Sequence, residues 1–386
     1  MTFILDRLPT PEEFFRDYWN KKPFVVRGMV PAGVIDGLID EDHIAGLAME
    51  EEVTSRLVRK GENQAEWTCE HGPFEEEVFA DLGEEDWSLL VQNIDQYHAE
   101  TAELLKYFNL SPRWLLDDIM ASFSPKGGTV GAHIDSYHVF LVQGKGERRW
   151  KVANRPIVHE DYIQDIPLKI LSAPFEGEEV TTRSGDVIYI PPKFAHEGIS
   201  LKPSLTYSVG FLGPSLPEML IEFGHYIENC HPEVPRYLGK SLTETAVPFQ
   251  LPLDHVDDLR SFMTEVFDQE HFTKWLSHYF TSPTHVLDYE DEGAFNELDE
   301  DYSVEDIIAG SAELIKPPFI KMMIIPLAGT QRYCVSAQGL SFELDFADLN
   351  LANAMAQEVP FSADLFKNHR EILENLLKHN IVSFAD

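Results

Sequence analysis

Two histidines and one aspartate stand in a spacing that is typical of metal ligands. His133 and Asp135 are separated only by Ile134, and His196 follows much later, directly after the segment 191–195. In an extended strand, alternate side chains point to the same face, so His133 and Asp135 would project to one side and Ile134 to the other. A histidine from a distant strand would then complete a face of three ligands.

The residue types favour iron over a structural metal. Two imidazoles and one carboxylate on one face leave coordination positions open for a cosubstrate and dioxygen, as in non-haem Fe(II) oxygenases. A structural zinc site would need four closing ligands, usually with cysteine. A His-x-Asp pair also occurs by chance, and this chain has 15 histidines. The prediction therefore depends on the elements around the pair.

Those elements have the pattern of short antiparallel strands. Strands are expected over 137–143 and 147–152, joined by a glycine turn, and over 187–190, which ends at two prolines shortly before His196. Further strands are expected over 118–124, 168–171, 179–182 and 205–211. Short strands separated by Gly and Pro turns predict a jelly roll of the cupin type.

The sequence resembles a known family, the bacterial members of the JmjC-type, cupin-fold ribosomal oxygenases. The resemblance rests on motifs in four places: Phe14–Phe24, His133-Ile134-Asp135, Val139–Gly144 with Arg148-Arg149-Trp150, and Ile190-Pro191-Pro192 leading to His196. It covers essentially the whole chain. It implies an α+β fold with three parts: a JmjC-type double-stranded β-helix with N-terminal helical elements over 1–213, a helical dimerisation region over 214–287, and a winged-helix-like domain over 288–386.

The resemblance also implies an activity. Family members use Fe(II), 2-oxoglutarate and dioxygen to hydroxylate a ribosomal protein, and in the bacterial branch the target is an arginine of a large-subunit protein. His133, Asp135 and His196 would then be the metal ligands and the catalytic residues. The partner would be a basic ribosomal protein.

The resemblance assigns the cosubstrate to Arg148. In this family the basic residue that binds the distal carboxylate of 2-oxoglutarate stands thirteen positions after the ligand aspartate, which is Arg148 here. A guanidinium suits this contact because it can bind a carboxylate bidentately. The alternative is a surface charge at a strand end. Many other 2-oxoglutarate oxygenases place an arginine ten residues after the second histidine and a serine two later, where this chain has Thr206 and Ser208.

Several neighbouring side chains are candidates for supporting roles. Ser208, Ser122 and Ser124 could contribute hydroxyl groups to the cosubstrate, or be ordinary strand residues. Tyr137 would share the facing of His133 and Asp135 in a regular strand, so it could line the substrate pocket or fill the barrel. By the same alternation His138 would face away from the ligands and pack or lie at the surface, and Arg149 would face away from Arg148. Trp150 is expected in the barrel core.

Charge and cysteine content limit the partners and the compartment. The chain has 66 acidic and 30 basic residues and a formal net charge of −36, which disfavours direct nucleic-acid binding. Such a surface either attracts a basic protein or only serves solubility. The three cysteines, Cys69, Cys230 and Cys334, form no Cys-x-x-Cys motif, which is typical of a reducing, cytoplasmic compartment. Neither a signal peptide nor a long apolar run is present, so we expect no membrane role.

After residue 211 the apolar pattern becomes helical. Ser215 and Glu218 form a capping-box pattern, and apolar residues over 219–227 and 256–279 follow a helical period. They are too aromatic for one exposed face. They could pack onto the barrel or form a helical dimerisation region, and we expect the second, and hence a homodimer, because the resemblance implies it. An acidic linker is expected over 288–301.

The last part of the chain is compatible with a winged helix. It shows a helix after Ser303, strands over 319–325 and 333–344, and a closing helix over 362–380. From Ser303 to Asp386 there are 11 acidic and 6 basic residues, which argues against DNA binding.

Three functions from different classes are compatible with the sequence. The first is the ribosomal protein hydroxylase just described. The second is another JmjC-type activity, such as histidyl or asparaginyl hydroxylation or lysine demethylation. The third is a metal-binding cupin without turnover that serves as an interaction module. Arg148 beside a complete ligand set argues against the third, since an inactive module need not retain either.

Overall fold

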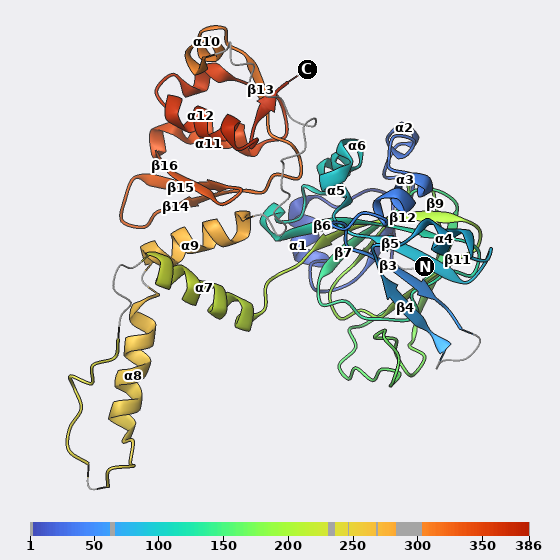
Figure 1. The fold of residues 1–386 in the computed structure, drawn as a ribbon, viewed down its shortest axis with the longest axis horizontal. Helices are drawn as coiled ribbons and strands as arrows, with labels where there is room; N and C mark the ends of the chain where they lie inside the picture. The colour runs from blue at the N-terminus through green and yellow to red at the C-terminus, as the bar shows by residue number, and fades with distance from the viewer. Residues whose placement is uncertain are drawn as a thin grey trace. The chain divides into compact units, whose positions relative to one another are not determined.

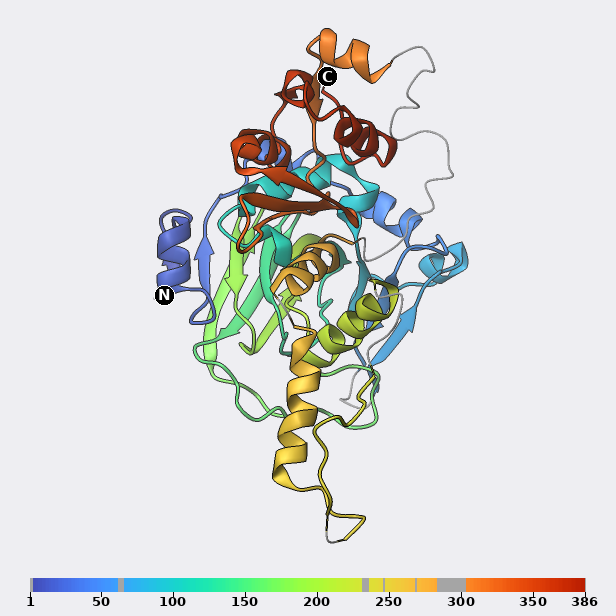
Figure 2. The same ribbon diagram turned by 90° about the vertical axis from the view of Figure 1, so that its left-hand side faces the viewer.

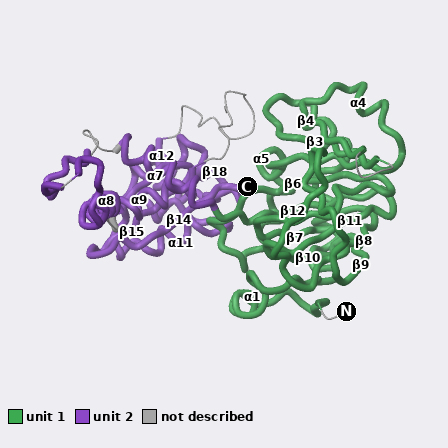
Figure 3. The backbone as a smooth tube through the Cα atoms, turned by 90° about the horizontal axis from the view of Figure 1, so that it is seen from below, with its two compact units in different colours: residues 1–213 green, residues 214–386 purple. Residues whose placement is uncertain are grey.

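The computed structural model describes residues 3–61, 66–230, 236–245, 247–267, 269–282 and 303–385. The chain divides into two compact units, residues 1–213 and 214–386, which Figure 3 shows in different colours. The division into three domains, with a boundary at 287/288, stays a prediction, and the acidic stretch 288–301 lies outside the described residues.

Strands make up most of the regular secondary structure of the first unit (Figure 1). They are β1 (Ile4–Leu5), β2 (Phe24–Val26), β3 (Ser55–Arg59), β4 (Thr68–His71), β5 (Trp87–Val91), β6 (Leu116–Ser124), β7 (His138–Gln143), β8 (Glu147–Ala153), β9 (Gly177–Arg183), β10 (Val187–Ile190), β11 (His196–Ser200) and β12 (Ser204–Phe211). One sheet has nine strands in the order β1-β2-β10-β7-β12-β6-β5-β3-β4, and the second has three in the order β11-β8-β9. All these pairs are antiparallel except β1 with β2.

Short helices of the first unit precede or connect its early strands. They are α1 (Pro11–Asp17), α2 (Ala32–Ile35), α3 (Glu41–Leu47), α4 (Glu76–Ala80), α5 (Ile94–Tyr97), α6 (Ala99–Ala102) and the 3₁₀ helices η2 (Glu103–Phe108) and η3 (Arg113–Leu115). Helix α1 begins at a capping box in which Thr10 and Glu13 satisfy each other's backbone N–H groups. Its Phe14 is fully buried and contacts Phe24, Phe140 and Tyr189.

Side-chain alternation gives the large sheet two different faces. One face carries Leu89, Ala121 and Tyr207, which belong to the core cluster that also contains Phe14 of α1 and Ile44 of α3. The other face meets the three-stranded sheet. Buried apolar residues of both sheets form one cluster there: Val25, Val139, Leu141, Trp150, Val152, Val180, Ile188, Ile190 and Phe194. Two facing antiparallel sheets of this kind are the expected jelly roll.

Most of the expected strands of the barrel are confirmed, but the one over 168–171 is wrong. Residues 154–176 form a long connection between β8 and β9 without a regular strand. Within it, Leu171 makes a single bridge with Tyr162, and its side chain packs in a small apolar cluster. Apolar residues in an irregular connection therefore mimicked a strand pattern. Strands β1 to β5 were not expected, and they enlarge the first sheet well beyond a minimal jelly roll.

The second unit begins with helices that include α7 (Leu216–Cys230), α8 (Leu253–Glu265) and α9 (Gln269–Thr281). The predicted capping box at the start of α7 is confirmed, since the Ser215 N–H donates to Glu218 Oε2 at 2.6 Å. The helical period expected over 256–279 is divided between α8 and α9. In Figures 1 and 2, α8 and the chain before it extend away from the rest of this unit.

The C-terminal part of this unit has its own core. Its elements are α10 (Val304–Ala309), β13 (Glu313–Ile315), β14 (Met322–Pro326), β15 (Arg332–Ala337), β16 (Leu340–Asp345), η4 (Phe346–Asp348), α11 (Leu349–Ala356), β17 (Phe361–Ser362), η5 (Ala363–Phe366), α12 (Arg370–Lys378) and β18 (Ser383–Phe384). Two sheets form, β17-β13-β18 and β14-β15-β16.

Two expectations for this part need correction. The strand over 333–344 is a hairpin, because Gln338 and Gly339 both have positive φ and reverse the chain. The helix over 362–380 is shorter, because β17 and η5 precede α12. The winged-helix assignment stays a prediction. No helix among the described residues has the length and apolarity needed to span a membrane.

Candidate metal centre

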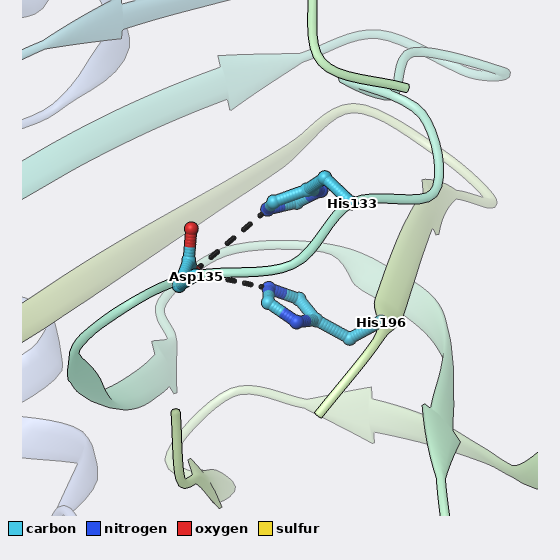
Figure 4. Close-up of side chains that lie close together, drawn as sticks. All are labelled: His133, Asp135 and His196. Atoms are coloured by element: carbon cyan, nitrogen blue, oxygen red, sulfur yellow. Dashed lines mark ion pairs between the residues drawn. The ribbon is translucent and has the colours of Figure 1, made fainter. Parts of the chain in front are cut away.

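The structure brings the predicted ligand set together. Nε2 of His133 lies 3.9 Å from Oδ2 of Asp135, and Nε2 of His196 lies 3.4 Å from the same oxygen. Figure 4 shows that His133 and Asp135 come from one segment and His196 from another, and that the three side chains converge. Among the described residues this is the one group of three or more His, Cys, Asp or Glu side chains whose ligand atoms all lie within 4.8 Å of one another.

Backbone hydrogen bonds hold the two ligand segments side by side. His133 and His196 exchange a pair of backbone bonds, each 3.0 Å long, and Lys193 N–H donates to Asp135 O at 2.9 Å. The bridge between His133 and His196 is isolated, and β7 begins only at His138. The prediction of a regular strand through His133 and Asp135 is therefore wrong, although both side chains do face the same site.

Both imidazoles are oriented for metal binding. Nδ1 of His133 lies 2.9 Å from Gly131 O, and Nδ1 of His196 lies 3.1 Å from Phe194 O. Because a carbonyl oxygen only accepts, each Nδ1 carries the proton in the neutral ring, and each Nε2 keeps a free lone pair. Burial, together with the nearby imidazole of His133, lowers the pKa of His196 to about 4. A neutral imidazole is the form that binds a metal.

The spacing of the ligand atoms fits an ion after a small contraction. Two ligand atoms at right angles, each about 2.1 Å from a common ion, would be about 3.0 Å apart. The distances from Asp135 to His133 and His196 are 3.9 and 3.4 Å. One carboxylate and two neutral imidazoles on one side would leave the other side of the ion open.

Arg148 is a buried cation without a carboxylate partner. It is 3% exposed, whereas Arg149 on the same strand is exposed. Its two hydrogen bonds are long and go to neutral oxygens, Thr206 Oγ1 at 3.3 Å and Gly198 O at 3.4 Å, and its Nε has no partner. Burial lowers the pKa of Arg148 to about 10, so it remains charged at neutral pH. Such a charge is costly to bury unless an anion compensates it.

The register of β8 against β11 places Arg148 on the same interior wall as His196. Val152 pairs with His196 and Arg148 pairs with Ser200, four residues further along β11, which is roughly 13 Å. Trp150 lies between them: its ring centroid is 6.2 Å from that of His196 and 5.1 Å from Cζ of Arg148. A short dicarboxylate could therefore bridge the metal site and the guanidinium.

Sequence reasoning missed the residues that hold Arg148 in place. Thr206 accepts its hydrogen bond, and Gly198 leaves room for it. A Cβ at Gly198 would lie 2.7 Å from the Trp150 ring and 2.8 Å from Arg148 Nε. A glycine two residues after a candidate ligand histidine was the available signal, because a strand glycine often marks a close approach.

The three candidate serines lie on the barrel wall but differ in their partners. Ser122 pairs with Thr206 across β6 and β12, and its hydroxyl donates to Thr206 O at 3.3 Å. Ser124 shares a hydrogen bond of 2.7 Å with Ser88 Oγ, so this hydroxyl is already engaged. Ser208 is buried and shares a face with Thr206. Contact of these hydroxyls with a cosubstrate stays a prediction.

Tyr137 packs against the apolar interior cluster and close to the ligand set. Burial raises its pKa, and the negative charges of Asp135 and Asp118 raise it further. Lining the substrate pocket and filling the barrel would both place Tyr137 inside the barrel, so its location fits either role. Contact of Tyr137 with a substrate stays a prediction. His138 is buried, stacks on Trp19 and shares a hydrogen bond of 2.8 Å with Tyr189 OH, which confirms a packing role.

A jelly roll with a His-Asp-His set and a buried arginine on its inner wall defines the class: a cupin-fold metal centre of JmjC type. A JmjC domain model matches residues 103–219. The ribosomal protein uL16 3-hydroxylase of Escherichia coli (strain K12) is 38% identical over 283 residues, which cover 72% of each chain. A probable ribosomal oxygenase of Haemophilus influenzae is 40% identical over 221 residues, which cover 56% of this chain and 53% of that protein.

Solved structures extend the similarity to nearly the full length. The X-ray structure of E. coli YcfD has a TM-score of 0.80 at 31% identity and covers 98% of both chains. The structure of YcfD, a ribosomal oxygenase, in complex with cobalt and 2-oxoglutarate has a TM-score of 0.77 at 31% identity and covers 97% of this chain and 98% of that one. The chain belongs to the family of JmjC-domain ribosomal oxygenases.

Proposed function

We propose that this protein hydroxylates an arginine side chain of a large-subunit ribosomal protein, with uL16 as the first candidate. It is a 2-oxoglutarate-dependent dioxygenase whose cofactor is Fe(II). The observation that supports the proposal most directly is the location of Arg148, a buried cation without a carboxylate partner on the wall that also carries His196. A metal-binding module without turnover would have no use for that charge.

Each residue of the site has a role in this proposal. His133, Asp135 and His196 hold the metal. Arg148 and Thr206 bind the distal carboxylate of 2-oxoglutarate, and the hydroxyls of Ser122, Ser124 and Ser208 support this contact. When bound, iron and 2-oxoglutarate activate dioxygen, so that 2-oxoglutarate becomes succinate and carbon dioxide and one oxygen atom enters a C–H bond of the substrate. The apolar interior around Trp150 keeps water from the reacting atoms.

The charge around Tyr137 supports a cationic target side chain. Burial raises the pKa of Tyr137 most, and the charges of Asp135 and Asp118 come next. Arg56 opposes them with a smaller effect, and Asp117 raises the pKa least. Asp118 is buried on the same face of β6 as Ser122. An arginine entering beside Tyr137 would meet this negative potential, whereas an asparagine would gain little from it. The net charge of −36 acts in the same direction on a whole basic protein.

We further propose that residues 214–287 mediate homodimerisation and that residues 288–386 form a winged-helix-like domain for protein contacts. The support is an unusual set of exposed apolar side chains on α7, on α8 and on the chain between them. They are Leu216, Leu220, Ile221, Leu238, Leu242, Val247, Phe249, Leu251, Leu253 and Met263, each between 46% and 98% exposed. Exposed apolar side chains in such number are typical of a protein–protein interface.

The test is turnover on ribosomal proteins. The enzyme would be reconstituted with Fe(II) and 2-oxoglutarate without air and then exposed to air, with uL16 or total ribosomal proteins. We expect succinate release, and a mass increase of one oxygen atom on one arginine, both lost in an Asp135→Ala control. Succinate release with a modified histidine, asparagine or lysine would replace the arginine assignment. No succinate from metal-loaded protein would contradict the proposed activity.

A further inference from the structure

The long connection between β8 and β9, residues 154–176, is an ordered support rather than a free surface loop. It closes on itself, because Ile163 N–H donates to Ile170 O at 2.8 Å and Ser172 N–H donates to Asp161 O at 3.0 Å. It also bonds to both ligand segments. Leu171 N–H donates to Ala132 O, the residue before His133, and Ile157 N–H donates to Lys193 O, both at 2.8 Å.

The segment that carries His133 and Asp135 needs such a support. It belongs to no regular strand, and its backbone bonds to the segment of His196 are an isolated bridge at His133 and a single bond at Asp135. In a regular strand, the ladder of backbone hydrogen bonds to the neighbouring strand fixes the face to which each side chain projects. Here these few bonds are not part of a ladder, and a side-chain contact between the two ligands helps to fix the rotation of the backbone.

Ile134 makes that contact. It packs, on the side away from the metal site, against an apolar cluster of Leu171, Phe175, Ala153 and Ala195. Leu171 is 9% exposed and Phe175 is 8% exposed, although both belong to an irregular connection. Because the side chains of neighbouring residues point in opposite directions, anchoring Ile134 behind the site directs His133 and Asp135 into it.

Ile170 closes the turn that leads into the ligand segment. Gly131 has a φ of +81°, and a Cβ at this position would lie 2.8 Å from Cδ1 of Ile170. The same glycine supplies the carbonyl that fixes Nδ1 of His133 at 2.9 Å. The connection thus contacts the residues immediately before His133 and the residue immediately after it.

We propose that the connection 154–176 positions the metal ligands, with Leu171 and Ile170 as the positioning residues. Their packing holds the 131–135 segment against His196, so that the three ligand atoms stay close before a metal binds. The inference rests on the proposed metal site. Its consequence is specific: weakening this packing lowers metal affinity more than it changes the binding of 2-oxoglutarate, because Arg148 is held by other contacts, with Thr206, Gly198 and Trp150.

The experiment compares two leucine-to-alanine variants. Leu171→Ala removes the support, and Leu57→Ala removes a fully buried leucine of the other core cluster, on β3. Co(II) alone is the probe, and its ligand-field absorption reports affinity and geometry. We expect the Co(II) Kd of Leu171→Ala to rise roughly tenfold or more, as for groups that orient metal ligands, with an altered spectrum. We expect the KM for 2-oxoglutarate at saturating Fe(II) to stay within about twofold. Leu57→Ala should lose stability with an unchanged Co(II) spectrum.

The outcomes separate this inference from the proposed function. An unchanged Co(II) Kd in Leu171→Ala, or an equal rise in Leu57→Ala, would overturn the positioning role. If Leu171→Ala does not fold, Ile170→Val is the milder variant, and the same comparison applies. Wild-type protein that binds no Co(II), or a His133→Ala variant that binds it equally well, would instead contradict the metal site on which the inference rests.

Discussion

At the scale of single residues, Arg148 is a deeply buried charge with weak compensation. Its guanidinium is 3% exposed and bonds only to neutral oxygens. We expect Arg148→Gln to raise the KM for 2-oxoglutarate roughly tenfold to a hundredfold, because hydrogen bonds to a charged group contribute about 1.5–3 kcal/mol. Succinate formation at varied 2-oxoglutarate measures this. Arg149→Gln, on the exposed side of the same strand, is the matched control and should behave as wild type. Equal KM values in both variants would remove Arg148 from the cosubstrate site.

Gly198 is the second residue whose change should affect the cosubstrate. Alanine there would place its Cβ 2.7 Å from the rigid Trp150 ring and 2.8 Å from Arg148 Nε, so the guanidinium must move. We expect Gly198→Ala to raise the KM for 2-oxoglutarate several-fold and to leave Co(II) affinity nearly unchanged. Gly46→Ala, in helix α3 with open space around the glycine, controls for added bulk. A normal KM in Gly198→Ala would show that Arg148 tolerates the displacement.

The ligand residues could be predicted from the sequence, but the residues that support them could not. His133, Asp135 and His196 belong to local motifs, and the family resemblance supplied Arg148. Gly198 lies next to Arg148 because β11 pairs with β8, and Thr206 bonds to Arg148 because β12 contacts β8. Both contacts depend on the register between strands that are distant in sequence. Local spacing contains no information on that register.

At the scale of elements, a buried histidine on β7 ties the segment after α1 to the barrel. His138 is 6% exposed, stacks on Trp19 at 3.5 Å and bonds to Tyr189 OH. Burial lowers its pKa to about 4. In the unfolded chain its pKa is near 6.5, so below that pH the unfolded state binds a proton that the folded state does not. Stability is therefore lost as the pH falls from about 6.5 to about 4, by up to roughly 3 kcal/mol from this residue.

A substitution isolates this contribution. We expect the free energy of unfolding of metal-free wild type, from urea titrations, to fall more steeply between pH 7 and pH 4.5 than that of His138→Gln. All other titratable groups are the same in both proteins, so their contribution cancels in the comparison. Parallel pH dependences in the two proteins would mean that His138 is not held neutral in the folded state.

Element prediction succeeded where periodicity and turn residues agreed. Strands β6 to β10 and β12 lie close to their expected ranges because Gly and Pro mark their ends. The strand over 168–171 failed because Ile170 and Leu171 are apolar for a different reason: they pack behind the ligand segment. The large sheet was underestimated, since β1 to β5 are short and, except for β3 with β4, their partners are distant in sequence.

At the scale of the whole molecule, the exposed apolar residues of α7 and α8 predict self-association. Ile221 is 57% exposed and Met263 is 66% exposed. We expect sedimentation velocity at micromolar concentration to show a dimer for wild type, and a monomer for the double variant Ile221→Glu/Met263→Glu, because charges at a buried interface are costly. Leu201→Glu, an exposed apolar residue of the first unit, should leave the dimer intact. A monomeric wild type, or a double variant that stays dimeric, would contradict the proposed interface.

The net charge of −36 predicts opposite salt effects on the two substrates. A basic ribosomal protein is attracted by the acidic enzyme, and added salt screens that attraction, so kcat/KM for the protein substrate should fall as ionic strength rises from about 0.05 to 0.5 M. Steered association changes on-rates by roughly tenfold or more, so we expect a fall of about tenfold. 2-Oxoglutarate is an anion that the same field repels, so its KM should stay level or decrease slightly. A fall in kcat/KM of equal size for both substrates would point to a general salt effect on the enzyme, and no fall for the protein substrate would leave the acidic surface with a role in solubility alone.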